Sequence, residues 1–161
     1  MKRRIIGIAV ALLMGIGVAV ALEAPASAFV YPNRVMMGSL CLEAPSPGVA
    51  GDQLRLNACN GSAKQVFLFE DAGFDWGYFL HPASGGLCLQ AGAPDLFNST
   101  IIQWPCTFTN AQTWVLGTAP DSRRVLYTTR SHWCIGVNST FVGAYVIQAN
   151  CDGPGRRWVV G

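Results

Sequence analysis

Six cysteines recur along this 161-residue chain at a regular spacing. Short steps of 18, 18 and 17 residues alternate with long steps of 29 and 28, at Cys41, Cys59, Cys88, Cys106, Cys134 and Cys151. Six cysteines allow many disulfide connectivities, but this alternation groups them into three successive pairs. The spacing therefore predicts three disulfides, each closing a loop of 17 or 18 residues, with a structural rather than a redox or metal-binding role.

Other residues keep the same period. An aliphatic residue follows the first cysteine of each pair, and an aromatic residue follows the second after a short polar loop. These positions are Leu42, Leu89 and Ile135 after the first cysteine, and Phe67, Trp114 and Trp158 after the second. Self-similarity of this kind predicts a threefold internal repeat of about 45 residues, over about 35–76, 77–123 and 124–161. We expect the three aromatic residues to lie in the core.

Within each repeat, short apolar stretches alternate with turns rich in Gly, Pro, Asn and Ser, a pattern typical of β-strands. The expected strands are 78–81, 87–90, 101–104 and 113–116 in the second repeat, and 125–129, 133–137, 144–148 and 158–160 in the third. No stretch after residue 28 sustains a helical period. About twelve short strands in three copies predict an all-β fold, a closed barrel with pseudo-threefold symmetry.

The first 28 residues have the three-part pattern of a secretory signal peptide. Three basic residues precede an apolar run over 5–22, and the small-residue triplet Ala26-Ser27-Ala28 provides a cleavage site. An uncleaved membrane anchor is the alternative, because such a run nearly spans a bilayer. Alanines and glycines in the run, and Pro25 after it, favour cleavage. We therefore expect a secreted, extracellular protein, free of the membrane after signal removal, with one domain over 29–161.

Charge and side-chain chemistry exclude several functions. Removing the signal would leave eight basic and eight acidic residues, so no basic surface predicts nucleic-acid binding. The two histidines, His81 and His132, fall in different repeats, and no Ser/His/Asp, paired-carboxylate or metal-ligand spacing is present. Asp71 and Asp75 are interpreted as part of a loop that joins two repeats. We expect no enzymatic activity, no cofactor and no metal.

The repeated residues resemble the ricin-type β-trefoil lectin family, whose repeats begin with Cys-Leu and end with Gln-x-Trp. Gln112-Thr113-Trp114 matches the ending fully, Gln65-Val66-Phe67 matches it conservatively, and Arg156-Arg157-Trp158 keeps only the aromatic residue. The resemblance covers about residues 35–161. It implies a β-trefoil with one disulfide per repeat, in a small secreted bacterial member of the family that binds a glycan or glycoconjugate without catalysis.

The resemblance also implies which positions contact sugar. In this family an Asp two residues after the first cysteine accepts hydrogen bonds from sugar hydroxyls, and an aromatic residue two before the second cysteine stacks on the ring. A polar residue four before that cysteine and an Asn-Gln pair complete the set. In the second repeat these positions are Gln90, Trp104, Ile102, Ala111 and Gln112, with Gln103 and Asn110 one position away as possible substitutes.

The other two repeats depart further from the family pattern. In the first repeat the positions are Glu43, Arg55, Asn57, Lys64 and Gln65, so the carboxylate is kept but the stacking ring is lost. In the third repeat, the positions are Gly136, Ile147, Ala149, Arg157 (shifted by a gap) and Arg156, which keep nothing of the set. We expect one weak principal site in the second repeat, followed by the first.

Two alternatives stay open at this point. Gln112 is either a sugar ligand or a structural amide that bonds its loop, and Trp104 either stacks on sugar or packs beside the disulfide. The second alternative concerns the whole protein. Because every sugar site departs from the family set, the chain could instead be a protein-binding module, an inhibitor or accessory subunit of a secreted or surface complex. Phe97 and Phe141 would then be candidate contacts.

Overall fold

The computed structural model describes residues 30–46, 48–73 and 77–161, where the regular structure consists of short strands and two single 3₁₀ turns. The segment interpreted as a signal peptide and the residue Asp75 lie outside the described residues. The strands are β1 (Val30–Asn33), β2 (Val35–Met37), β3 (Leu40–Glu43), β4 (Arg55–Ala58), β5 (Phe67–Asp71), β6 (Gly77–Pro82), β7 (Leu87–Ala91), β8 (Ile101–Pro105), β9 (Thr113–Thr118), β10 (Arg124–Thr128), β11 (Cys134–Val137), β12 (Val146–Ala149) and β13 (Val159–Val160). The 3₁₀ turns are η1 (Ala63–Gln65) and η2 (Pro154–Arg156). The strands expected in the second and third repeats form within two residues of their predicted bounds.

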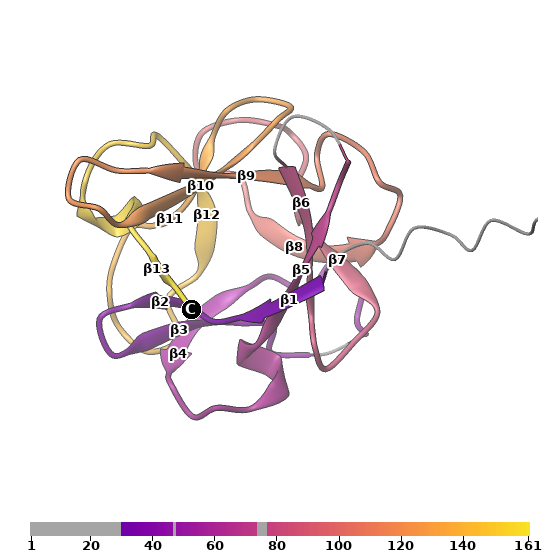
Figure 1. Ribbon diagram of the computed structural model, residues 1–161, viewed down its shortest axis with the longest axis horizontal. Helices are drawn as coiled ribbons and strands as arrows, with labels where there is room; N and C mark the ends of the chain where they lie inside the picture. The colour runs from indigo at the N-terminus through magenta and orange to yellow at the C-terminus, as the bar shows by residue number, and fades with distance from the viewer. Residues whose placement is uncertain (1–29, 47, 74–76) are drawn as a thin grey trace, which may run out of the picture.

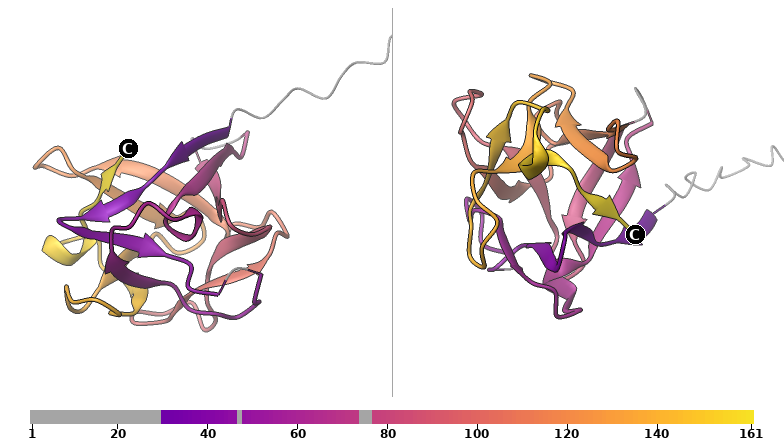
Figure 2. Two further views of the ribbon diagram at one scale, coloured as in Figure 1. Left: turned by 90° about the horizontal axis from the view of Figure 1, so that it is seen from below. Right: turned by 90° about the vertical axis from the view of Figure 1, so that its left-hand side faces the viewer.

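Each repeat begins with a strand that pairs with the last strand of another repeat. These antiparallel pairs are β5 with β6, β9 with β10, and β13 with β2. The third pair joins the two ends of the domain, because Arg34 and Gly161 also exchange backbone hydrogen bonds of 2.9 and 3.2 Å. The three repeats occupy three sectors around a common axis, with the C-terminus beside β2 (Figures 1 and 2). This arrangement is the β-trefoil that the resemblance implies.

The two middle strands of each repeat form a hairpin that carries a disulfide. The hairpins are β3–β4, β7–β8 and β11–β12. The disulfides join Cys41 to Cys59, Cys88 to Cys106 and Cys134 to Cys151, which confirms the pairing predicted from the spacing. In the chain-entropy model a closed loop of this length stabilises the fold by about 3 kcal/mol.

The core repeats with the same symmetry. Leu54, Ile101 and Val146 each lie five residues before the second cysteine of their repeat, and all three are fully buried. Around them, isolated β-bridges link each repeat to another, between Gln53 and Ile102, Thr100 and Ile147, and Tyr145 and Arg55. In every bridge, one residue lies six positions before the second cysteine of its repeat. Its partner lies four positions before the second cysteine of a different repeat. The barrel is therefore closed by equivalent contacts between all three repeats.

The aromatic residues that follow the second cysteines are buried, as predicted. The indole nitrogen of Trp114 donates to the carbonyl of Leu89 at 3.1 Å, and that of Trp158 donates to the carbonyl of Ile135 at 3.0 Å. Both carbonyls belong to the residue after the first cysteine. Each tryptophan thus fills the core and ties the end of its repeat to the hairpin, since a buried indole N–H needs a partner. Phe67 fills the same place in the first repeat without this bond.

Candidate functional site

The outer face of the β7–β8 hairpin carries the principal candidate residues. Cys88 faces Trp104 across the two strands, and Gln90 faces Ile102, so these four side chains share one face. Leu89, Ile101 and Gln103 alternate with them and are fully buried on the opposite face. Trp104 is 41% exposed and Gln90 is half-buried. The second repeat therefore presents an aromatic ring and a neutral amide to solvent from one short hairpin.

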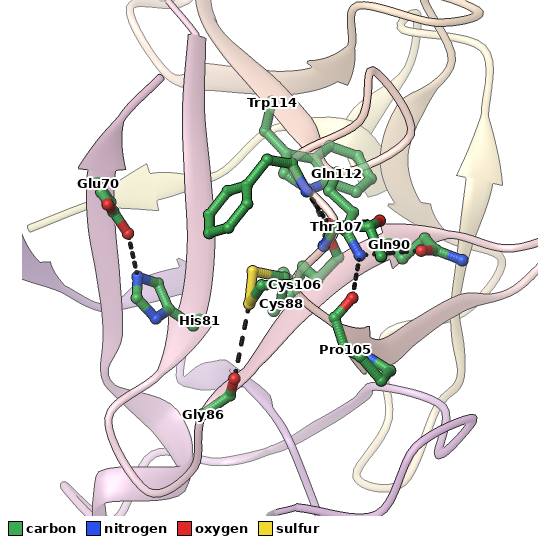
Figure 3. The surroundings of a disulfide bond; sticks show 12 residues. Glu70, His81, Gly86, Cys88, Gln90, Pro105, Cys106, Thr107, Gln112 and Trp114 are labelled. Carbon is green, nitrogen blue, oxygen red and sulfur yellow. Dashed lines mark hydrogen bonds and ion pairs between the residues drawn. A yellow bond between two sulfur atoms is a disulfide. The ribbon is translucent and has the colours of Figure 1, made fainter. Parts of the chain in front are cut away.

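Gln112 anchors this hairpin to the loop that follows the disulfide. Its Oε1 accepts hydrogen bonds from the backbone amides of Thr107 at 2.8 Å and Phe108 at 3.0 Å. Its Nε2 donates to the carbonyl of Pro105 at 2.8 Å and to Oε1 of Gln90 at 2.9 Å (Figure 3). Because Gln112 is fully buried, its side chain acts on the outer face through Gln90. This is the structural amide that the sequence left open as an alternative.

The first repeat builds the same network around a carboxylate. Gln65 is fully buried, accepts a hydrogen bond from the backbone amide of Asn60 at 2.8 Å, and donates to the carbonyl of Ala58 at 2.9 Å. It also donates to Oε2 of Glu43 at 2.7 Å, while Nδ2 of Asn57 donates to Oε1 of Glu43 at 2.7 Å. Both oxygens of Glu43 are thus bonded within the protein, and this residue is only 8% exposed. The first repeat keeps the carboxylate, but its oxygens are hydrogen-bonded within the protein and the residue is buried.

Tyr145 is not among the candidate residues predicted from the sequence, but it lies beside the first-repeat hairpin. Its ring is 4.9 Å from the guanidinium carbon of Arg55, and the residue is 52% exposed. Tyr145 belongs to the third repeat and reaches Arg55 through the bridge between repeats. The signal for it would have been the threefold pairing of positions six and four before the second cysteine, which links one repeat to another.

The third repeat replaces the network with an arginine. Gly136 occupies the position of Glu43 and Gln90, and a Cβ atom there would lie 3.0 Å from Cγ of Arg156 and 2.9 Å from Cβ of Ala149. The guanidinium of Arg156 donates to the carbonyl of Val137 at 2.9 Å. The space for a polar ligand-binding side chain is thus already filled, consistent with the loss of every family position in this repeat.

The two substitutes considered for the second repeat have different environments. Gln103 faces the interior, because it alternates with the outward Trp104, and its Nε2 donates to the carbonyl of Ser46 at 3.1 Å. It therefore does not reach the outer face. Asn110 is exposed and, with Thr109, Ala111 and Arg130, lines an open depression of about 560 Å³. Of the two, Asn110 alone lies at the surface.

Other chemistry is limited in the described part of the chain. The described ranges contain no group of three or more His, Cys, Asp or Glu side chains placed to hold a metal ion. His81 pairs with Glu70 at 3.3 Å, and His132 stacks on the ring of Tyr127. No helix among the described residues is long and apolar enough to cross a bilayer.

A family model for the ricin-type beta-trefoil lectin domain matches residues 75–161. The chain belongs to this family. The matched residues hold the second and third repeats, the two that keep tryptophan in the Gln-x-Trp ending. Membership in the ricin-type lectin family supports a carbohydrate-binding β-trefoil module.

Solved structures with the same fold share little sequence with this ricin-type domain. The designed 3-fold symmetric protein ThreeFoil is 21% identical, with a TM-score of 0.75 over 80% of this chain and 96% of its own. The Rhizoctonia solani agglutinin is 13% identical, with a TM-score of 0.71 over 85% and 98% of the two chains. The Polyporus squamosus lectin is 11% identical, with a TM-score of 0.66 over 85% of this chain and 50% of its own. Comparison with curated proteins gives no match.

Proposed function

We propose that the protein is a secreted, non-catalytic lectin-like module that binds a glycan weakly at one principal site on the outer face of β7–β8. One observation carries this proposal: an exposed Trp104 shares this face with Gln90, whose amide is held in place by the buried Gln112. A flat indole ring covers the C–H groups of a sugar ring, while the amide bonds its polar substituents.

The chemistry of the site supports weak binding. A neutral amide makes weaker hydrogen bonds than the carboxylate that the family places at this position, because charge-assisted bonds are about twice as strong. Only part of the Trp104 side chain is free, since the residue is 41% exposed. A small contact area with one oriented amide leaves little free energy after the cost of ordering a ligand.

Secretion is part of the same proposal. Three disulfides join all six cysteines of the chain, and disulfides persist mainly in oxidising compartments outside the cytosol. Together with the signal pattern over residues 1–28, they support export. Retention by an uncleaved N-terminal anchor would be detected as full-length protein in the membrane fraction rather than a shortened chain in the medium.

The proposed site is tested by replacing its aromatic residue. The full chain is expressed with its own N-terminus, and the protein recovered from the medium is applied to a glycan array. We expect Trp104→Ala to reduce glycan retention about 10-fold or more, because the stacking surface is lost. Phe141→Ala, which removes an exposed ring from another loop, should leave glycan retention unchanged. An array that stays blank at high protein concentration contradicts the proposal.

Exposed apolar loop residues favour a second candidate function, a protein-binding module that has lost sugar binding. Phe97 is 46% exposed and Phe141 is 62% exposed, in corresponding loops of the second and third repeats. Exposed aromatic rings of this kind are enriched at protein interfaces. Under this alternative, the protein would capture a secreted or surface protein from culture supernatant. That capture would be insensitive to free sugars and would be weakened by Phe141→Ala.

A further inference from the structure

Resting on the proposed function, we propose that the β7–β8 site recognises a sugar bearing an acetamido group, and that Gln90 is the residue that selects it. The first step concerns which end of each amide faces which partner. Backbone N–H groups of Thr107 and Phe108 can only donate, so the end of Gln112 that meets them is its oxygen. The opposite end, at the carbonyl of Pro105, is its nitrogen.

The orientation of Gln112 determines that of Gln90. The remaining N–H of Gln112 points at Gln90, so the end of Gln90 that faces it, 2.9 Å away, is its oxygen. The Nε2 of Gln90 and its two hydrogens are therefore directed away from Gln112. None of the described residues accepts a hydrogen bond from this nitrogen, which the half-buried side chain leaves open to solvent. The site thus presents a donor where Glu43 of the first repeat is an acceptor.

The open amide nitrogen of Gln90 pairs with an acceptor on the sugar. A carboxylate accepts from sugar hydroxyls, whereas an amide nitrogen requires an oxygen lone pair. A sugar hydroxyl and the carbonyl oxygen of an acetamido group both offer such lone pairs, but the acetamido group carries a methyl group beside its acceptor. The surroundings of this donor therefore decide between the two groups.

The surroundings of Gln90 favour an acetamido group over a hydroxyl. Ile102 lies directly across the hairpin from Gln90 and offers an apolar surface to the acetamido methyl group. Trp104 lies two residues further along the same face, where the sugar ring would stack.

Matched sugar pairs test the inference with the disulfide-bonded protein secreted from the full chain. Its affinity is measured for N-acetylglucosamine against glucose and for N-acetylgalactosamine against galactose, each immobilised on a column, with a glucuronate column beside them. We expect at least one acetylated sugar to be retained about 10-fold more tightly than its hydroxyl counterpart. Gln90→Glu keeps an acceptor toward Gln112 but replaces the outward donor by an acceptor. In that variant we expect the preference to fall to about one.

Asn150→Asp is the matched control, because it makes the same amide-to-carboxylate change at an exposed residue of the third repeat and should keep the preference. Equal affinity for both members of every pair overturns the acetamido inference while sugar binding itself stands. Preferential retention on glucuronate overturns it in favour of a carboxylate. A preference that survives Gln90→Glu overturns the role of Gln90. Retention on none of the columns overturns this inference and the proposed function together.

Discussion

At the scale of single residues, the buried glutamines of the Gln-x-aromatic ending have two roles. Each one forms hydrogen bonds with backbone groups of its loop, and each one also orients a neighbouring side chain on the outer face of the hairpin. Gln112 satisfies two backbone amides and one carbonyl and still directs Gln90. Gln65 bonds one backbone amide, that of Asn60, and the carbonyl of Ala58, and it also donates to Glu43. Because buried polar groups are costly when unpaired, the glutamine is required by the fold even where the sugar site has changed.

The two buried glutamines of the second repeat should differ in their contribution to stability. We expect Gln112→Met to lower the free energy of unfolding by about 2 kcal/mol, since it leaves the loop amides and the Pro105 carbonyl unpaired. Gln103→Leu should cost less than about 1 kcal/mol, because Gln103 makes one side-chain bond, its Oε1 has no partner, and Leu56 occupies the equivalent place in the first repeat. Urea unfolding with the disulfides intact measures both, and equal losses would refute the argument.

At the scale of elements, the β7–β8 hairpin is held at its open end by a disulfide and by the Gln112 network. Cys88 lies directly opposite Trp104, and Cys106 follows Pro105, the last residue of β8. The cross-link therefore fixes the strand that carries the exposed ring and the carbonyl that orients Gln112. A disulfide elsewhere in the barrel stabilises the fold without touching this hairpin.

Removing one disulfide at a time should show which of them affects glycan binding as well as the stability of the fold. Alanine at both Cys88 and Cys106, or at both Cys134 and Cys151, is expected to lower the free energy of unfolding by about 3 kcal/mol in each case, because the loops have similar lengths. Only the first double variant should also weaken glycan binding several-fold. Thermal unfolding and titration with glycan, performed below both transitions, test this. Equal weakening in both variants would contradict a site on β7–β8.

At the scale of the whole molecule, three similar backbones carry three different outer faces. The second repeat presents Gln90 and Trp104 to solvent. The first repeat buries Glu43 in hydrogen bonds within the protein, and the third fills the site with Arg156 over Gly136. Pseudo-symmetry of the fold therefore does not extend to the chemistry of the surface. One repeat keeps the combination of an exposed ring and an open polar group.

One principal site per molecule has a measurable consequence. Calorimetric titration with a monovalent acetylated sugar should give one binding site per chain, and the protein should fail to agglutinate cells or precipitate a polymeric glycan. Cross-linking needs at least two sites on one particle, and avidity arises only from such multivalent contact. A stoichiometry of two or three sites per chain, or agglutination by the monomer, would contradict the assignment of a single principal site.

The sequence alone determined the repeat, the disulfide pairing, the all-β fold and the buried aromatic residues. These features depend on spacing that recurs at a fixed period, and on apolar residues such as Trp114 and Trp158 that have one favourable place in a small domain. It also identified Trp104 and Gln90 as the candidates that the structure brings to one face. The inward position of Gln103 follows from its neighbour Trp104 facing outward, because strand side chains alternate.

Only the tertiary structure decided how the polar side chains are used. Three features depend on contacts between residues 14 to 90 positions apart. These are the hydrogen bonds that occupy Glu43, the donor that replaces an acceptor at Gln90, and the position of Tyr145 beside Arg55. The hydrogen-bond direction of an amide is set by all of its neighbours at once, and these neighbours lie on different strands and loops of the repeat. Burial that recurs at a fixed period can be predicted from short stretches of the sequence. A polar site forms only when segments that are separated in the sequence come together in the fold.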